Sequence, residues 1–162
     1  MSIMPPSERL VARGEGAEPN PDRFRKILGR VPTSVAVVSG LAPDGEPVGL
    51  AVGTLTSVSL DPPLIAFCAG RESTSWPRIR PGKRFCVNVL AQPQEPVSAV
   101  FASKRPDKFA EVEWSPSAHG IPMIHGVTAW IECVIDEEHE AGDHTIVLGR
   151  VERLEAGPAQ AP

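Results

Sequence analysis

The chain has 162 residues, of which 41% are hydrophobic and 22% are charged, and its formal net charge is −4. This length and balance are typical of a globular protein with one domain and a sizeable core. A nucleic-acid-binding surface would need a basic stripe and a membrane span would need about 20 consecutive apolar residues, and the sequence contains neither. Because the first residues also lack a charged and then apolar leader, we expect a cytoplasmic protein.

The N-terminal part predicts a tail followed by one short helix. Residues 1–20 are polar, aperiodic and rich in Pro and Gly, which indicates a mobile tail. Asp22 can then cap a helix that stops at Gly29 and presents three apolar side chains on one face, namely Phe24, Ile27 and Leu28.

Most of the remaining chain predicts β-strands. Apolar or alternating runs are separated by turns rich in Pro and Gly, and the sequence APDG between the first two runs predicts a hairpin. We expect a loop with at most one helical turn over 71–82, a helix over 94–103 and an irregular segment over 105–126. The predicted strands cover residues 33–41, 46–55, 56–60, 63–70, 84–91, 127–142 and 144–157.

This pattern predicts a mainly β fold. Antiparallel sheets avoid exposed edge strands by closing on themselves, so we expect a β-barrel with short flanking helices. Cys68, Cys86 and Cys133 each lie in an apolar run, and their odd number and wide spacing argue against disulfides and against a zinc site. We therefore expect buried free thiols.

Three common kinds of site do not fit the sequence. Neither the P-loop GxxxxGK[ST] nor a GxGxxG between a strand and a helix is present. A GxSxG elbow is missing too, and in a strand Asp143 and His144 would point to opposite faces, so that Asp143 would not orient His144 for hydrolysis. His119 and His125 are six residues apart, which suits no helical pair of metal ligands. We expect no metal site.

The segment GTLTS over 53–57 is the remaining candidate for a binding site. Gly53 lets a ligand approach the backbone closely, and Thr54, Thr56 and Ser57 bring hydroxyl groups that can bind a phosphate, a sugar chain or a heteroaromatic edge. The alternative is an ordinary strand surface, because Thr and Ser are frequent there.

Several segments together resemble the flavin reductase-like family, whose members are small reductases that supply reduced flavin to two-component monooxygenases. The resemblance follows the order of the chain, and its most specific segments are TSVSLDPP, VNVLA and GDHTIVLGRV. It implies a split β-barrel of the FMN-binding type over 21–157, with 158–162 as a C-terminal tail or a truncated last strand.

The resemblance also implies a function and a set of site residues. It implies hydride transfer from NAD(P)H to FMN or FAD, a homodimer, and a flavin-dependent monooxygenase as partner. His144 resembles the residue that meets the nicotinamide. The residues that the resemblance places at the flavin are Gly53, Thr54, Leu55, Thr56, Ser57, Ser73, Ser75, Ala91, Gln92, Gln94, Phe101, Lys108 and Phe109.

The sequence is also compatible with other interpretations. His144 can instead be a turn residue, and Lys108 can be a solvated lysine beside Asp107 rather than a partner of a flavin phosphate. The protein as a whole can be a flavin-binding electron carrier or sensor without turnover, or a purely structural dimeric barrel. FMN and FAD are not distinguished, and neither are NADH and NADPH.

Overall fold

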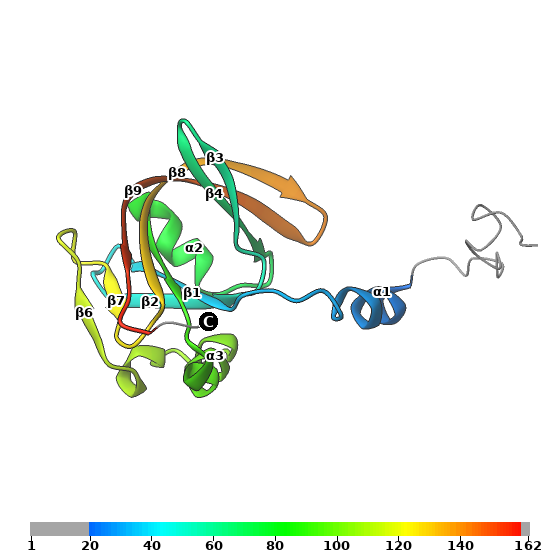
Figure 1. Ribbon diagram of the computed structural model, residues 1–162, viewed down its shortest axis with the longest axis horizontal. Coiled ribbons are helices and arrows are strands. Elements are labelled where there is room, and N and C mark those ends of the chain that lie inside the picture. The colour runs from blue at the N-terminus through cyan, green and yellow to red at the C-terminus, as the bar shows by residue number, and fades with distance from the viewer. Residues whose placement is uncertain (1–19, 160–162) are drawn as a thin grey trace, which may run out of the picture. The chain divides into compact units, whose positions relative to one another are not determined.

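A computed structural model of the chain describes residues 20–159 (Figure 1). The predicted mobile tail lies outside this range except for its last residue, and the final three residues of the predicted C-terminal tail lie outside it as well. The described residues belong to two compact units, one that ends at Pro32 and one that begins at Thr33.

The first unit contains helix α1 (Pro21–Leu28), which the sequence predicted with the wrong cap. The cap is Asn20, whose side-chain oxygen accepts a hydrogen bond from the N–H of Arg23 at 2.9 Å. Pro21 explains the shift, because a proline has no N–H to satisfy and its fixed φ suits the first helical position. Asp22 therefore lies inside the first turn, where its negative charge is favourable.

The second unit is built on one antiparallel sheet of seven strands in the order β2-β1-β5-β8-β9-β4-β3 (Figure 1). This order confirms the predicted mainly β fold. The two outer strands, β2 and β3, are not paired with each other, so the strands of residues 20–159 do not form a closed barrel. The strands are β1 (Ala36–Leu41), β2 (Pro47–Val52), β3 (Thr56–Leu60), β4 (Pro63–Gly70), β5 (Arg84–Val89), β8 (Ala129–Ala141) and β9 (His144–Ala156).

Short helices connect the strands, as predicted. Helix α2 (Trp76–Ile79) is the single turn expected after β4, and α3 (Glu95–Ala102) is the expected helix after β5. The segment predicted to be irregular instead contains a second, two-stranded sheet of β6 (Trp114–Pro116) and β7 (Pro122–Ile124). Strands of three residues are too short for an alternating pattern to be visible. Three 3₁₀ turns complete the unit, η2 (Arg80–Gly82), η3 (Gln92–Gln94) and η4 (Lys108–Glu111).

Strand β1 is buried on both of its faces and separates two apolar clusters. Ala36 and Val38 belong to one cluster and Val37 to the other, as expected for side chains that alternate along a strand. The larger cluster contains an edge-to-face aromatic trio with centroid separations of 5.2–6.0 Å, made by Phe67, Trp76 and Phe85. The smaller cluster lies under α3 and contains Phe101 and Phe109.

Two tight turns close the hairpin of β1 and β2 and the hairpin of β8 and β9. Gly45 (φ +84°) closes the predicted hairpin of β1 and β2, and Gly142 (φ +64°) closes the hairpin of β8 and β9. Both glycines have the left-handed φ that other residues rarely adopt. The second turn places His144 opposite Ala141 on β8 and opposite Gly70 on β4. No helix within 20–159 is long and apolar enough to cross a bilayer.

Candidate functional site

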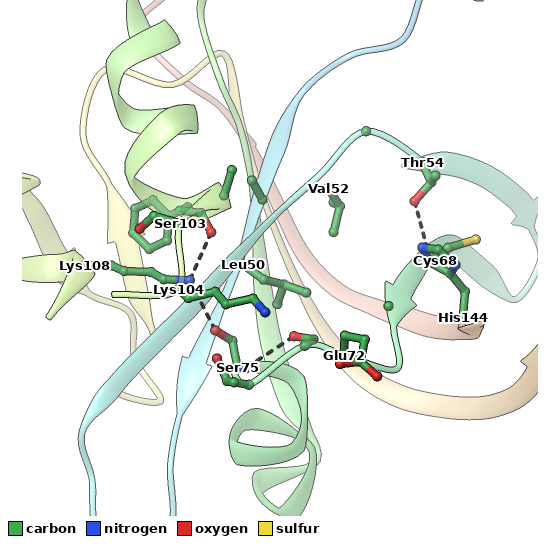
Figure 2. A pocket seen from close by; sticks show the side chains of 17 residues that line it. Leu50, Val52, Thr54, Cys68, Glu72, Ser75, Ser103, Lys104, Lys108 and His144 are labelled. Carbon is green, nitrogen blue, oxygen red and sulfur yellow. Dashed lines mark hydrogen bonds between the residues drawn. The ribbon is translucent and has the colours of Figure 1, made fainter. Parts of the chain in front are cut away.

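A cavity of about 320 Å³, here called the main cavity, opens between the end of β2, the loop after β4, the end of α3 and the start of β9 (Figure 2). Figure 2 shows Thr54, Cys68 and His144 on one side of the cavity and Ser103, Lys104 and Lys108 on the other. Its wall is formed by Leu50, Ala51, Val52, Gly53, Thr54, Cys68, Gly70, Glu72, Ser73, Thr74, Ser75, Phe101, Ala102, Ser103, Lys104, Lys108 and His144.

The loop after β4 brings two serine hydroxyls to the cavity. Ser73 Oγ accepts hydrogen bonds from the backbone N–H groups of Ser75 and Trp76, at 3.3 and 3.2 Å. Ser75 Oγ accepts from Lys108 Nζ at 3.4 Å. Because each oxygen acts as an acceptor in these contacts, its own proton remains available to a ligand in the cavity.

Lys108 is buried and fully engaged. Its ammonium also donates to the backbone carbonyls of Gly49 at 3.2 Å and Phe101 at 3.0 Å, and only 7% of the residue is exposed. Burial lowers the pKa of the Lys108 ammonium below its usual value. With its three donors directed at protein oxygens, Lys108 ties together β2, the serine loop and the end of α3. The alternative of a solvated lysine beside Asp107 is therefore wrong.

Lys104 has the opposite surroundings. It is exposed, it lines the main cavity, and it has no hydrogen-bond or ion-pair partner among residues 20–159. Figure 2 shows its side chain extending into the cavity, between Leu50 and Ser75. A free ammonium at this point can bind an anionic group of a ligand as a point charge.

Thr54 and Cys68 form the other end of the cavity. Thr54 Oγ1 accepts a hydrogen bond from the backbone N–H of Cys68 at 2.8 Å, which fixes the segment after β2 against β4. Cys68 is only half-buried and lines the cavity, so the prediction of a buried core thiol is correct for Cys86 and Cys133 but wrong for Cys68.

His144 lines the same end and is oriented by Asp143, contrary to the prediction from strand geometry. His144 Nδ1 lies 2.7 Å from Asp143 Oδ1. The prediction failed because Asp143 belongs to the turn, where side chains do not alternate as they do in a strand. The Nε2 atom faces Gly70, since a Cβ atom at Gly70 would lie 3.7 Å from it.

Arg71 holds the turn that carries His144 against the serine loop. Its backbone N–H donates to the carbonyl of Asp143 at 2.9 Å, and its guanidinium donates to the carbonyl of Gly142 at 3.3 Å. The guanidinium also pairs with Glu140 at 3.0 Å. Arg71 thus links the two loops that border the main cavity.

A second space of about 210 Å³, here called the side cavity, adjoins the main cavity. The two share Thr74, Ser75, Lys104 and Lys108 as a common wall. Beyond this wall, the side cavity is lined by Pro47, Val48, Gly49, Arg78, Arg105, Pro106 and Phe109.

A third cavity, of about 250 Å³ and bordered by Trp130, Glu132 and Arg153, is a weaker candidate for chemistry. Ser117 Oγ donates to Glu132 Oε1 at 2.9 Å, and His119 Nδ1 lies 2.8 Å from the same oxygen. The side chains of Ser117 and His119 thus both bind the carboxylate. The hydrogen bond that joins the two residues comes from the backbone N–H of His119 to Ser117 Oγ at 3.2 Å, whereas hydrolysis would require the imidazole at this hydroxyl. Burial raises the pKa of the nearby Cys86 thiol to about 12, which keeps it protonated and unreactive at neutral pH.

The structure brings seven of the predicted site residues together and leaves seven elsewhere. Gly53, Thr54, Ser73, Ser75, Phe101, Lys108 and His144 line the main cavity. Phe109 lines the side cavity. Gln94 instead accepts from the N–H of Ala91 and donates to the carbonyl of His125, within the chain's own fold. The other residues that do not line the main cavity are Leu55, Thr56, Ser57, Ala91 and Gln92.

Sequence reasoning missed several cavity residues, among them Leu50, Val52, Cys68 and Lys104. The apolar ones lie in runs that read equally well as core. The hydroxyl pattern of GTLTS named Thr54, Thr56 and Ser57 together, and of these three only Thr54 lines the main cavity, whereas the other two lie in β3.

Comparison with known proteins gives a consistent result. Residues 28–162 match the family described as "Flavin reductase like domain". A flavin reductase of Pseudomonas putida is 50% identical over 136 residues, which is 84% of this chain and 80% of that protein. A flavin reductase (NADH) of Kitasatospora aureofaciens is 44% identical over 132 residues, 80% of this chain and 69% of that protein. The crystal structure of nitrilotriacetate monooxygenase component B from Mycobacterium thermoresistibile superposes with a TM-score of 0.82 at 42% identity, and covers 87% of this chain and 78% of that chain.

Proposed function

The chain belongs to the flavin reductase-like family, and from that premise we propose that it is an NAD(P)H-dependent flavin reductase whose main cavity binds FMN or FAD. A bound flavin supplies the acceptor for the hydride of the nicotinamide. The protein's own residues then have three tasks, which are to bind the flavin, to orient the nicotinamide and to keep the two rings in contact.

The observation that supports this proposal most is that the main cavity has a polar end with a positive charge and an apolar middle part. Hydroxyls of Ser73 and Ser75 and the free ammonium of Lys104 form one end, which suits a phosphate. Leu50 and Val52 border the space between the ends, and Gly53 and Gly70 leave room beside the backbone for a flat ring. The volume of about 320 Å³ lies within the range of about 300–1,000 Å³ typical of small-ligand sites.

His144 is the proposed contact of the nicotinamide nucleotide. When Nδ1–H donates to the Asp143 carboxylate, a neutral imidazole presents Nε2 as an acceptor toward the cavity. That acceptor can receive a hydrogen bond from the N–H of the nicotinamide carboxamide and so hold the ring in place. Hydride transfer requires reacting atoms about 3–3.5 Å apart, but it requires no protein acid or base, and positioning is therefore the contribution we assign to His144.

We further propose a homodimer with a split-barrel fold. An edge strand with exposed apolar side chains is a typical association surface. Strand β3 forms an edge of the sheet, and 50% of Val58 and 95% of Leu60 are exposed. Light scattering coupled to size-exclusion chromatography gives the oligomeric state directly, and a monomer would contradict this part of the proposal.

The proposed physiological partner is a flavin-dependent monooxygenase that consumes the reduced flavin. The name of the solved relative, a monooxygenase component, supports this. A cytoplasmic location is proposed on the three free cysteines, because thiols persist in reducing compartments.

The deciding experiment is NADH oxidation by the purified protein with FMN or FAD as the acceptor. We expect many turnovers per protein molecule. A tightly bound flavin without turnover would instead indicate an electron carrier or sensor, and neither binding nor turnover would indicate a structural protein. Replacing NADH with NADPH in the same assay determines the preferred nucleotide.

A further inference from the structure

The side cavity continues the main cavity at the end where a flavin phosphate would lie. The two spaces are separated by Ser75, Lys104 and the buried Lys108, which line both. A ligand held with its ring near His144 and its phosphate near Lys104 therefore has further space beyond its phosphate. FMN ends at this phosphate, whereas FAD continues through a second phosphate into adenosine.

The chemistry of the side cavity suits an adenosine phosphate. Arg78 and Lys104 bring positive charge to its rim, and no acidic residue lines it. Arg105 also lines the rim, but its guanidinium is already paired with Glu111 and, at 3.6 Å, with Asp107. Arg78 makes only a long contact of 3.9 Å with Asp44, in which 43% of the Arg78 side chain and 64% of the Asp44 side chain are exposed, so its guanidinium remains available to a ligand. A guanidinium can pair with a phosphate or stack on a flat ring.

The remaining wall of the side cavity is apolar. Pro47, Val48, Pro106 and Phe109 provide surfaces on which a purine can pack. The volume of the main cavity lies at the lower end of the range for small-ligand sites, so a ligand as large as FAD needs the additional space of about 210 Å³.

From this arrangement we infer that the side cavity binds the adenosine phosphate half of FAD, so that the protein prefers FAD to FMN. The inference rests on the proposed function, because it assumes that the main cavity binds the flavin ring. NADH carries the same adenosine phosphate unit and is the other possible source of this ligand. We assign the cavity to FAD because it lies beyond Lys104, at the end of the main cavity opposite to His144.

The test compares the dissociation constants of FAD, FMN and riboflavin, measured by fluorescence titration of the full chain without NADH. We expect FAD to bind at least about tenfold more tightly than FMN, a factor that one or two added polar contacts supply. AMP alone should compete with FAD and leave riboflavin binding unchanged.

Two variants and one control locate the preference. Pro106→Trp fills the side cavity from an exposed loop position, and Arg78→Gln removes one cation from its rim. Both should raise the dissociation constant of FAD toward that of FMN and change that of FMN less than twofold. Arg80→Gln is the matched control, because Arg80 follows α2 but pairs with Glu138 and lines none of the three cavities.

Each unfavourable outcome has a distinct meaning. Equal affinities for FAD and FMN in the unmodified protein, or a preference that survives both variants, would overturn the inference, while turnover of FMN by NADH would leave the proposed function intact. A change in the Michaelis constant for NADH without a change in FAD affinity would assign the side cavity to the nucleotide and also overturn the inference. Absence of any flavin binding would refute the proposed function itself.

Discussion

The two ends of the main cavity are held in place in different ways. At one end the buried ammonium of Lys108 joins three segments through three hydrogen bonds. At the other end His144 lies on a hairpin turn, where its partner Asp143 is 94% exposed and the Arg71–Glu140 pair is open to solvent. Solvent-exposed pairs contribute little to stability, whereas buried groups are costly to disrupt. The end assigned to the flavin is thus preorganised, and the end assigned to the nicotinamide is adjustable.

The largest effect is expected from Lys108→Met. The substitution leaves the carbonyls of Gly49 and Phe101 without their donor, and we expect the free energy of unfolding to fall by about 1–3 kcal/mol. Flavin affinity should fall with it. Chemical denaturation measures the first quantity. Lys104→Met is the matched control, with unfolding changed by less than about 0.5 kcal/mol. Equal stability losses in the two variants would remove the distinction between the two ends.

His144→Ala should act on the nucleotide and not on the flavin. We expect the Michaelis constant for NADH to rise about tenfold, the equivalent of one lost hydrogen bond of about 1.4 kcal/mol. The dissociation constant of the flavin should change less than twofold. Steady-state kinetics and flavin titration on the same preparation separate the two quantities, and unchanged kinetics would make His144 an ordinary turn residue.

Thr54→Val tests which hydroxyl of the segment 53–57 contributes to binding. The variant loses a hydroxyl that lines the cavity and accepts from the N–H of Cys68, so we expect flavin binding to weaken by a few-fold and at most about tenfold. Thr56→Val is the matched control, because Thr56 is exposed on β3 and does not line the cavity. A larger loss in the control would show that the flavin contacts β3.

Arg71→Met should have a smaller effect than His144→Ala, in the same direction. Loss of the guanidinium contacts to Gly142 and Glu140 loosens the turn without removing the imidazole, and an exposed contact is worth about 0.2–1 kcal/mol. We therefore expect the Michaelis constant for NADH to rise about twofold to fivefold. Arg153→Met, on the same strand as His144 but lining the third cavity, should leave it unchanged.

The smallest effect concerns pH. Burial lowers the pKa of Lys108 in the folded protein below its ordinary value of 10.5. Between these two values the unfolded chain binds more protons than the folded chain, so the contribution of Lys108 to the free energy of unfolding rises with pH in this window. Denaturation at mildly and strongly alkaline pH should show this rise relative to Lys108→Met. If the free energy of unfolding instead falls over this pH range relative to Lys108→Met, the folded protein favours the charged form of Lys108.

The comparison of the two ends also shows what could be predicted from the sequence. The strands, the APDG turn and helix α3 follow local patterns of alternation, turn residues and helical spacing, and they were predicted correctly. The segment SKRPDKF contains two lysines, and nothing in its spacing indicates that Lys108 turns inward while Lys104 remains free. That difference depends on carbonyls supplied by Gly49 and Phe101, which only the tertiary structure brings to the same place.

The hairpin turn gives the same lesson on a smaller scale. Strand β9 begins at His144, so the alternation of side chains along a strand does not apply to Asp143 in the preceding turn. For this reason the sequence wrongly excluded the contact between Asp143 and His144. Similarly, the sequence named the hydroxyls of Thr54, Thr56 and Ser57 together, and only the structure separates Thr54, which lines the cavity, from the other two, which lie in β3.

The most direct test of the account is a crystal structure of the protein with a bound flavin. We predict that the ring lies between Leu50, Val52 and His144 and that its phosphate contacts Lys104 and the hydroxyls of Ser73 and Ser75. A flavin bound in the cavity beside Trp130 and Glu132, or one whose phosphate points toward His144, would contradict it.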